Sequence, residues 1–249
     1  MRSLITATAL GAALLPSFVS AHGYVSNVTV GGKTFPGSDP VWFYFPDDSR
    51  PETAGWDALN QDLGFVSPSA FGTVDIACHI SATAGKLSID ANAGDSVDFI
   101  WNDWADSHKG PIINYIAPCD GDCSTATAGD LKFTKISASG LLGADNWATD
   151  EMMANDFTSS MTLPANLKAG NYVIRHEIIA LHGGGSENGA QNYPQCLNFK
   201  VGGSGTVAPP AGTAGTALYK SDDPGILFDI YNNVKDYPIP GPELWTGAN

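Results

Sequence analysis

Apolar and polar residues alternate through the middle of the chain, which is the pattern of half-buried β-strands. Residues 86–101, KLSIDANAGDSVDFIW, place Leu87, Ile89, Val97 and Phe99 on one face around the turn NAGD. This arrangement predicts a β-hairpin with its apolar face inward. Five further segments between Gly, Pro and Asn turns read as strands: PIINYIAP (111–118), FTKISAS (133–139), SSMTLPA (159–165), NYVIRHEIIALH (171–182) and CLNFKVGG (196–203).

No long amphipathic helix pattern accompanies these strands, and only residues 53–63 and 145–156 favour short helical turns. Many short strands separated by turn residues are typical of an antiparallel β-sandwich. We therefore predict an all-β fold, an immunoglobulin- or fibronectin-III-like sandwich with long loops at its ends.

The first 21 residues have the layout of a secretory signal. One charge, Arg2, precedes the apolar run LITATALGAALLPSFV, and Val19 and Ala21 form the small-residue pattern of a cleavage site. The run is too short to span a bilayer, and no later run reaches the roughly 18 apolar residues that a membrane helix needs. We expect cleavage after Ala21, which makes His22 the first residue of a secreted, extracellular protein.

The chain is acidic, with 12 Lys and Arg against 26 Asp and Glu and a formal net charge of −14. This balance argues against nucleic acid or anionic membranes as partners and favours a neutral substrate. Residues 22–249 are long enough for one large β domain. The segment 202–217, GGSGTVAPPAGTAGTA, has the composition of a flexible linker. The 32 residues after it are too few to fold alone, so we expect a tail (about 203–249) that packs back on the sandwich.

Four cysteines allow three disulfide pairings. The close pair Cys119 and Cys123, in CDGDC, is placed to bridge one loop, which leaves Cys78 and Cys196 for a long-range link. In the loop-entropy model that link stabilises the fold by about 4 to 5 kcal/mol. The CDGDC motif also has the spacing of a metal site, but an oxidising compartment favours the disulfide.

His22 is a candidate metal ligand because of its place in the chain. A histidine at the N-terminus offers its α-amine and a ring nitrogen to the same metal ion. A second imidazole completes three nitrogens in the tetragonal arrangement that copper prefers. The amine has a reference pKa of about 7.7 to 8.0, so metal binding displaces its proton at small cost near neutrality. A cleavage site that falls before a histidine by coincidence is the alternative.

Two further histidines fit the same site. His108 lies in a predicted loop before Gly110 and Pro111, where its ring can project from the end of the sandwich. His176 and His182 share a strand face but lie about 20 Å apart at about 3.3 Å per residue, so only one of them can approach a given metal. His182 ends its strand beside a glycine-rich loop and is the better candidate. We assign structural roles to His176 and to His79, the neighbour of Cys78.

A polar pair follows the glycine-rich loop. Gln191 and Tyr193 fall on the same face of AQNYPQC, and Cys196 is placed to anchor their strand covalently. A tyrosine and an amide fixed in this way can line a metal site.

Taken together, six motifs resemble the fungal lytic polysaccharide monooxygenases of auxiliary activity family 9, formerly glycoside hydrolase family 61. The resemblance covers essentially all of residues 22–249, including both cysteine pairs. Its motifs are HGYV (22–25), SHKGP (107–111), RHEIIALH (175–182), GAQNYPQC (189–196), DPGI (223–226) and YPIPGPELW (237–245).

The resemblance implies a role for each candidate residue. His22 would give copper its amine and ring nitrogen, His108 the third nitrogen, and Tyr193 an axial phenol. His182 and Gln191 would form the outer shell around the oxygen species. One copper ion per chain is implied, with disulfides Cys78 to Cys196 and Cys119 to Cys123. The Gly/Thr-rich stretch would lead into a tail that wraps the sandwich, and no carbohydrate-binding module is expected.

The implied reaction is oxidative cleavage of β-1,4-glycosidic bonds in cellulose or a related β-glucan, by hydroxylation at C1 or C4. It uses O2 or H2O2 and an external electron donor, which is a small-molecule reductant or a redox enzyme. A monomer is expected. Two rivals are a glycoside hydrolase, which needs two carboxylates about 5 to 9.5 Å apart, and a non-catalytic polysaccharide- or copper-binding sandwich. The chain has no carboxylate motif that competes with the histidine set.

Three more residues carry weaker signals. Tyr24 and Tyr237 are candidate aromatic residues for stacking on sugar rings. Asn27 begins the sequon NVT, a candidate N-glycosylation site that lies five residues from the predicted ligand His22.

Overall fold

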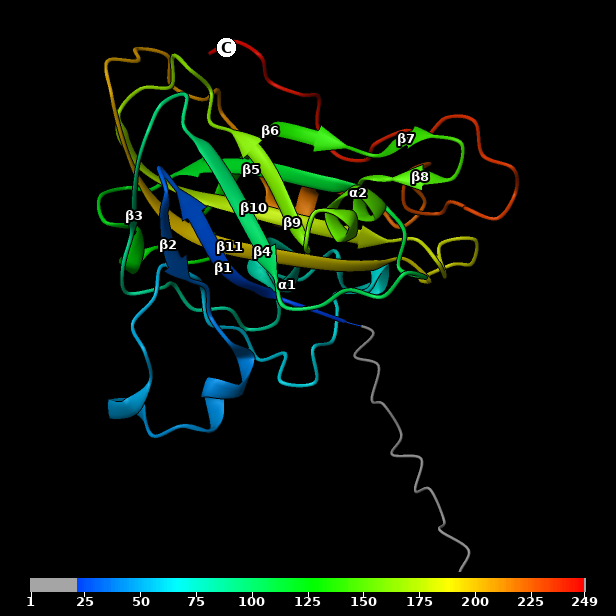
Figure 1. Ribbon diagram of the computed structural model, residues 1–249, viewed down its shortest axis with the longest axis horizontal. Helices are drawn as coiled ribbons and strands as arrows, with labels where there is room; N and C mark the ends of the chain where they lie inside the picture. The colour runs from blue at the N-terminus through cyan, green and yellow to red at the C-terminus, as the bar shows by residue number, and fades with distance from the viewer. Residues whose placement is uncertain (1–21, 249) are drawn as a thin grey trace, which may run out of the picture.

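Two β-sheets pack face to face in the computed structural model, which describes residues 22–248 (Figure 1). The predicted secretory signal, residues 1–21, lies outside the described residues. One sheet has the strand order β2 (Lys33–Pro36), β1 (Val25–Val30), β4 (Ser96–Trp101), β9 (Thr158–Thr162). The other has the order β12 (Thr213–Ala214), β6 (Lys132–Ser139), β5 (Ile112–Pro118), β10 (Gly170–Ala180), β11 (Gln191–Gly202), β3 (Ile89–Asn92).

The remaining elements are short. Strands β7 (Leu141–Gly143) and β8 (Asn146–Trp147) form a small hairpin. The helices are α1 (Asp75–Cys78), α2 (Ala148–Ala154) and the 3-10 turns η1 (Pro40–Tyr44), η2 (Asp47–Ser49), η3 (Pro68–Ala70), η4 (Cys123–Thr125) and η5 (Gly215–Ala217). No helix in the described part of the chain is long and apolar enough to cross a membrane.

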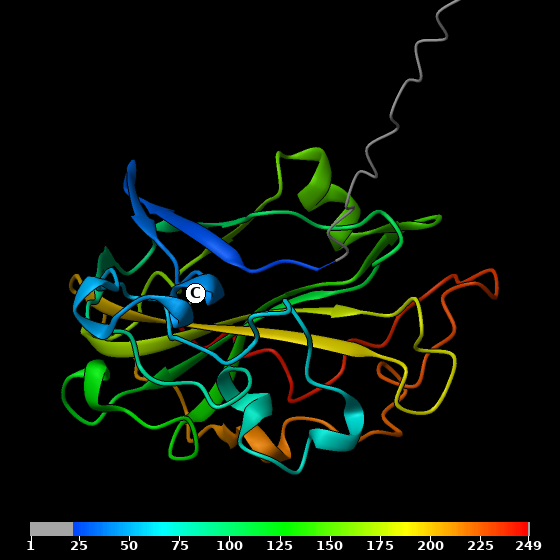
Figure 2. The ribbon, with the colours of Figure 1, turned by 90° about the horizontal axis from the view of Figure 1, so that it is seen from below.

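The first core lies between the two sheets. Figure 2 shows the layers edge-on, with β1 in blue on one side and β11 in yellow on the other. Alternate strand residues point into this space, and Val28, Phe99, Ile174 and Phe199 are each fully buried there. The period-two pattern therefore assigned Ile89, Val97 and Phe99 to the inward face correctly, and the predicted β-sandwich is confirmed.

The predicted hairpin of residues 86–101 is wrong. Strand β3 pairs in parallel with β11, whereas β4 pairs with β1 and β9 in the other sheet. The turn at residues 92–95 therefore carries the chain from one layer to the other, where Ile89 and Phe99 lie in the same core. Leu87 precedes β3 and is about half exposed, not inward. Alternation shows which face is buried but not which strand is the neighbour.

A second core covers the outer face of the six-stranded sheet, so β5 and β10 are buried on both faces. Tail residues Leu218, Tyr219, Ile226 and Tyr237 belong to this core. The segment 202–217, whose composition is that of a linker, is held by strand β12 and by hydrogen bonds such as Lys168 N to Val207 O at 2.8 Å.

A buried ion-pair cluster, which consists of Arg175, Glu177, Tyr219 and Asn192, lies in this second core. The Arg175 guanidinium donates twice to Glu177, at 2.6 and 2.8 Å, and also donates to the carbonyls of Ile76 and Ala77. The Asn192 amide and the Tyr219 hydroxyl donate to the same carboxylate. Because every charged atom has a partner, the cluster offsets the cost of removing two charges from water.

Both predicted disulfides are present, Cys78 to Cys196 and Cys119 to Cys123. Of the two predicted helical turns, the one at 145–156 is confirmed as α2, and its first turn is capped by Asp150. The one at 53–63 is wrong, because Gly55 bridges to Leu197 and Asp57 bridges to Thr83 instead. The backbone pairing of Gly55 with β11 therefore outweighs the weak helix propensity of residues 53–63.

Candidate metal centre

Four candidate side chains meet at one end of the sandwich, although their positions span 172 residues of sequence. His22 lies before β1, His108 lies in the loop between β4 and β5, His182 lies just after β10, and Tyr193 lies at the start of β11. The His22 ring centroid is 5.3 Å from that of His108 and 5.6 Å from that of Tyr193. The rings of His108 and His182 are 3.9 Å apart. We call these four residues the histidine cluster.

The loop that carries His108 is fixed at both ends. The Trp104 indole donates to the His108 carbonyl at 2.9 Å, and its ring lies 4.9 Å from Tyr193. Gly110 is needed for close approach, because a Cβ there would lie 1.9 Å from the carbonyl oxygen of Ile179. These contacts hold the His108 imidazole in one orientation.

His108 has one ring nitrogen engaged and one without a partner. Its Nδ1 lies 3.1 Å from the Ser107 hydroxyl, whereas its Nε2 is buried with no hydrogen-bond partner among residues 22–248. The Nδ1 of His182 is likewise buried without a partner in that part of the chain. Since buried polar atoms are rarely left unsatisfied, these two nitrogens point to a ligand.

The three imidazoles of the histidine cluster are held neutral. Burial, together with the His182 and His22 rings, lowers the pKa of His108 to about 4. Burial also lowers the pKa values of His22 and His182, and the Asp62 carboxylate partly offsets this shift at His22. A neutral imidazole keeps the lone pair that a metal ion requires.

Gln191 and Tyr193 interact directly, as their shared strand face predicts. The Tyr193 hydroxyl donates to Gln191 Oε1 at 2.7 Å, and burial raises the pKa of Tyr193 well above its usual value. The Tyr193 phenol therefore stays protonated, and the amide group of Gln191 is oriented with its NH2 left to donate.

A metal ion fits this donor set. Imidazole nitrogen suits copper, zinc, iron and nickel, and copper binds most tightly among divalent ions at a given nitrogen site. Residues 22–248 contain no group of three His, Cys, Asp or Glu side chains that would hold a metal. The imidazoles of His22 and His108, whose ring centroids are 5.3 Å apart, are the pair of nitrogen donors that the cluster brings together.

The other predicted residues lie outside the cluster. His176 is fully buried, with Nε2 accepting from Trp101 at 3.0 Å and Nδ1 lying 2.7 Å from Asn114 Oδ1, which is a structural role. His79 is also buried, and its Nδ1 accepts from the Ile80 amide. Asn27 is half-buried on β1.

Tyr237 is not a sugar-stacking residue. It is 7% exposed, its ring packs against Trp147 and Phe228 at about 5 Å, and its hydroxyl donates to Gly225 O. The ring belongs to the second core, together with Trp147 of the β7–β8 hairpin. The motif alone gave no sign of this burial.

Tyr231 was missed by the sequence analysis and is 72% exposed. The tail before it contacts the glycine loop after His182, because the Phe228 amide donates to Gly184 O at 2.7 Å. In Figures 1 and 2 this orange tail segment lies beside the yellow loop that joins β10 to β11. Tyr231 is 49 residues from His182 in sequence, so only the docked tail brings it near.

Comparison with known proteins identifies the family. The profile of Auxiliary Activity family 9 (formerly GH61) matches residues 22–237. The AA9 family lytic polysaccharide monooxygenase F of Emericella nidulans is 51% identical over 246 residues, covering 97% of this chain and 98% of that protein. A second monooxygenase F, from Malbranchea cinnamomea, is 50% identical over 94% of this chain and 95% of its own length.

Solved structures agree in fold. The extended catalytic domain of Hypocrea jecorina LPMO9A has a TM-score of 0.87 and 44% identity, with 92% of each chain covered. Cel61B of the same organism, described as a glycoside hydrolase family 61 member, has a TM-score of 0.85 and 42% identity over 90% of this chain and 100% of its own. The chain therefore belongs to Auxiliary Activity family 9, and it is a copper-dependent polysaccharide monooxygenase with an immunoglobulin-like β-sandwich.

Proposed function

We propose that this chain holds one copper ion in the histidine cluster and oxidatively cleaves β-1,4-glycosidic bonds of cellulose at C1 or C4. The observation that carries the proposal is the convergence of His22 and His108, together with a buried His108 Nε2 that has no hydrogen-bond partner within residues 22–248. His108 Nε2 would be one ligand and the His22 ring a second, and the Tyr193 phenol would lie close to the ion.

The third nitrogen would be the α-amine of His22. Cleavage after Ala21 converts the amide nitrogen of His22 into that amine, and the family profile begins its match at His22. An amide nitrogen in a peptide bond has no available lone pair, so correct processing decides whether the site forms. Removal of a secretory signal also implies that the protein is exported, and we propose that it acts outside the cell as a monomer.

When bound, copper supplies the one-electron redox chemistry that lets an external reductant and O2 or H2O2 hydroxylate a glycosidic carbon. The protein's part is to fix the ligands and to place polar groups beside them. His182 packs on His108 and offers Nδ1 for proton transfer, and Gln191, whose Oε1 accepts from the Tyr193 hydroxyl, keeps its NH2 group available as a donor. These two groups would supply a proton-transfer group and a hydrogen-bond donor beside the copper ion.

Tyr24 and Tyr231 are the aromatic residues that we propose contact the polysaccharide. Tyr24 is two residues from His22 and half-buried, and Tyr231 is exposed on the tail that docks on the loop after His182. An aromatic face can stack on the apolar face of a sugar ring, which suits the surface of a polymer.

Electron paramagnetic resonance on two forms of the protein tests the metal site. One form begins at His22, and the control retains one extra residue before it. We expect an axial Cu(II) spectrum with nitrogen coupling in the first form only. Equal, weak binding by both forms would contradict the proposed role of the His22 amine.

Product analysis on cellulose tests the reaction. We expect oxidised chain ends that appear only when reductant is added and that disappear in His108→Ala. New reducing ends without reductant would indicate hydrolysis. Copper binding without oxidised ends would indicate a binding protein.

A further inference from the structure

We propose that Thr149 is a positioning residue for the metal centre, which holds the His108 loop through a buried hydrogen bond to Gly110. The Gly110 amide donates to Thr149 Oγ1 at 3.0 Å. Thr149 is fully buried and Gly110 is buried as well, so the bond is shielded from water. Gly110 is two residues from His108, whereas Thr149 is 39 residues from Gly110, in α2.

The Gly110 amide faces away from β10. On the β10 side, the Leu181 amide donates to the Lys109 carbonyl at 2.8 Å. The Ile179 amide donates to the Pro111 carbonyl at 3.2 Å on the same side. Backbone groups of successive residues alternate between the two sides of an extended segment, so the amide of Gly110, which lies between these two residues, points to the opposite side.

Strand β6, the neighbour of β5 on that opposite side, ends before it reaches Gly110. The last pair between β5 and β6 joins Ile112 to Ser139. The chain then continues into β7, β8 and α2, and the first residue of α2 donates its amide to the Gly140 carbonyl at 2.8 Å. This bond fixes the start of α2 next to the end of β6. Thr149 therefore supplies the acceptor that a longer β6 strand would have supplied.

The segment that Thr149 holds also sets the distance between His108 and His182. Lys109 follows His108 directly, and its carbonyl is bonded to the amide of the residue before His182. The two imidazole rings are 3.9 Å apart. Because Gly110 is held from the α2 side and Lys109 from the β10 side, the His108 ring is fixed relative to the His182 ring. Loss of the Thr149 bond would free one of these two anchors.

A second contact joins the same elements at the surface. The Lys109 ammonium lies 3.1 Å from the Asp145 carboxylate and 3.7 Å from that of Asp150, and it donates to the Asp145 carbonyl at 3.0 Å. The Asp145 side chain is 77% exposed, so solvent weakens this ion pair. A buried amide that loses its acceptor is more costly, because it is left without water or protein to bond. The Thr149 hydroxyl is therefore the contact whose loss should move His108 most.

This inference deepens the proposed function and rests on it for the role of His108 as a copper ligand. The Thr149 hydroxyl bonds the main chain two residues from that ligand, so it acts on the position of His108 and not on the reacting atoms. Loss of a group that orients a metal ligand typically weakens metal binding by about 10- to 100-fold. The position of the His108 ring can also be measured without any metal.

The experiment compares Thr149→Val with the parent chain, both beginning at His22. Valine keeps the shape of threonine but offers the Gly110 amide no acceptor. In the metal-free proteins, NMR should show amide hydrogen exchange at Gly110 that is about tenfold faster in the variant, and a weaker nuclear Overhauser effect between the His108 and His182 rings. A competitive titration with Cu(II) should show about tenfold weaker copper binding.

Two variants serve as controls. Thr149→Ser keeps the hydroxyl and should restore both the ring contact and the copper affinity of the parent. Thr134→Val removes another buried hydroxyl, which donates to the Pro210 carbonyl at 3.3 Å on the part of β6 that lies away from the metal centre. It should lower stability without changing copper affinity. If Thr149→Val loses the native spectrum, Thr149→Ala carries the test, because the space it leaves lets water reach the Gly110 amide.

Three results would overturn the proposal. The first is a copper affinity and a ring contact in Thr149→Val that match those of the parent. The second is an equal loss of copper affinity in Thr149→Val and Thr134→Val, which would indicate a general loss of stability. The third is a Thr149→Ser variant that binds copper as weakly as Thr149→Val. If the parent itself bound no copper, the proposed function would fail, and the ring contact measured without metal would still decide whether Thr149 positions His108.

Discussion

The ion-pair cluster and the histidine cluster are both buried and polar, and strand β10 leads from one to the other. In the ion-pair cluster each nitrogen of the Arg175 guanidinium and both oxygens of Glu177 have partners. In the histidine cluster His108 Nε2 and His182 Nδ1 have none within residues 22–248. Asn192 Oδ1 is also without a partner in that part of the chain, but it is a neutral atom at the edge of a fully paired Arg175–Glu177 ion pair. Pairing of the buried charges stabilises the fold, whereas two unpaired imidazole nitrogens 3.9 Å apart between ring centres suit a ligand.

The largest expected effect concerns the disulfide beside the ion-pair cluster. Cys78 and Cys196 are 118 residues apart, so their replacement by alanine should lower the free energy of unfolding by about 5 kcal/mol in the loop-entropy model. Replacement of Cys119 and Cys123, four residues apart, should cost only about 2 kcal/mol. Urea denaturation of both variants measures the difference, and equal losses would contradict the loop-length argument.

The second effect tests the ion-pair cluster directly. Glu177→Gln keeps the shape of the side chain but leaves the buried Arg175 guanidinium without its counter-charge, which should cost about 3 to 5 kcal/mol. Glu187→Gln, at an exposed site in the glycine loop, is the control and should be close to neutral. A small effect of Glu177→Gln in urea denaturation would show that the cluster is not essential for stability.

The third effect tests the histidine cluster by ligand addition. If copper binds only the folded chain that begins at His22, a free concentration of about 100 times Kd should raise the free energy of unfolding by about 2.7 kcal/mol. His108→Ala should lose this gain, while its metal-free stability should fall less than that of Glu177→Gln. Undiminished copper stabilisation in His108→Ala would exclude His108 as a ligand.

The smallest effect concerns pH and His176, a buried histidine whose two nitrogens are satisfied. Burial lowers its pKa from 6.5 to about 3. Between these values the unfolded chain binds a proton that the folded chain does not, so stability is lost as pH falls from about 6.5 toward 3. The slope from this group is at most about 1.4 kcal/mol per pH unit.

His176→Gln isolates this contribution, because the other titrating groups are unchanged. The difference in unfolding free energy between the two proteins should narrow as pH falls from 7 to 4.5. A difference that stays constant over that range would mean that His176 titrates alike in the folded and unfolded chains. Urea denaturation at each pH measures it.

Local pattern was sufficient for several features of this fold. Alternation located β5, β6, β9, β10 and β11, and it assigned Gln191 and Tyr193 to one face, where they now share a hydrogen bond. The spacing of four cysteines in a chain with a predicted signal gave both disulfides. These features depend on local periodicity and on the type and spacing of residues, which can be read directly from the sequence.

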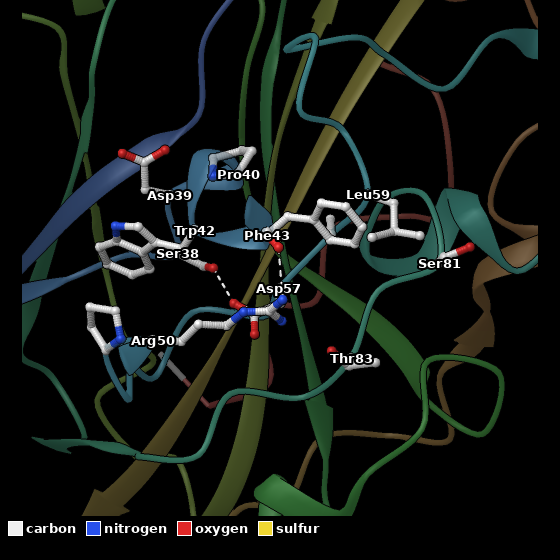
Figure 3. Close-up of a pocket in the computed structure, with 12 residues that line it drawn as sticks. Ser38, Asp39, Pro40, Trp42, Phe43, Arg50, Asp57, Leu59, Ser81 and Thr83 are labelled. Atoms are coloured by element: carbon white, nitrogen blue, oxygen red, sulfur yellow. Dashed lines mark hydrogen bonds between the residues drawn. The ribbon is translucent and has the colours of Figure 1, made fainter. Parts of the chain in front are cut away.

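Contacts between residues far apart in the sequence could not be predicted in the same way. The hairpin prediction for residues 86–101 failed because β3 and β4 join different sheets, and Tyr237 proved to be buried in the second core. The exposure of Tyr231 depends on how the tail packs on the sandwich. The pocket around Trp42, which Figure 3 shows with Phe43 and Leu59 on its other side, depends on how segment 38–51 packs against its neighbouring loops.

The sequence by itself determined the strands β5, β6, β9, β10 and β11, the two disulfides and the set of candidate metal-binding histidines, because each has a local or motif-level signature. Only the tertiary structure decided which of these residues meet. It brought His22, His108 and His182 to one end of the sandwich and left His176 inside the core. The physical reason is that strand pairing depends on the free energy gained by burying entire strand faces. That free energy includes contacts between residues far apart in the sequence, so no short segment can predict it.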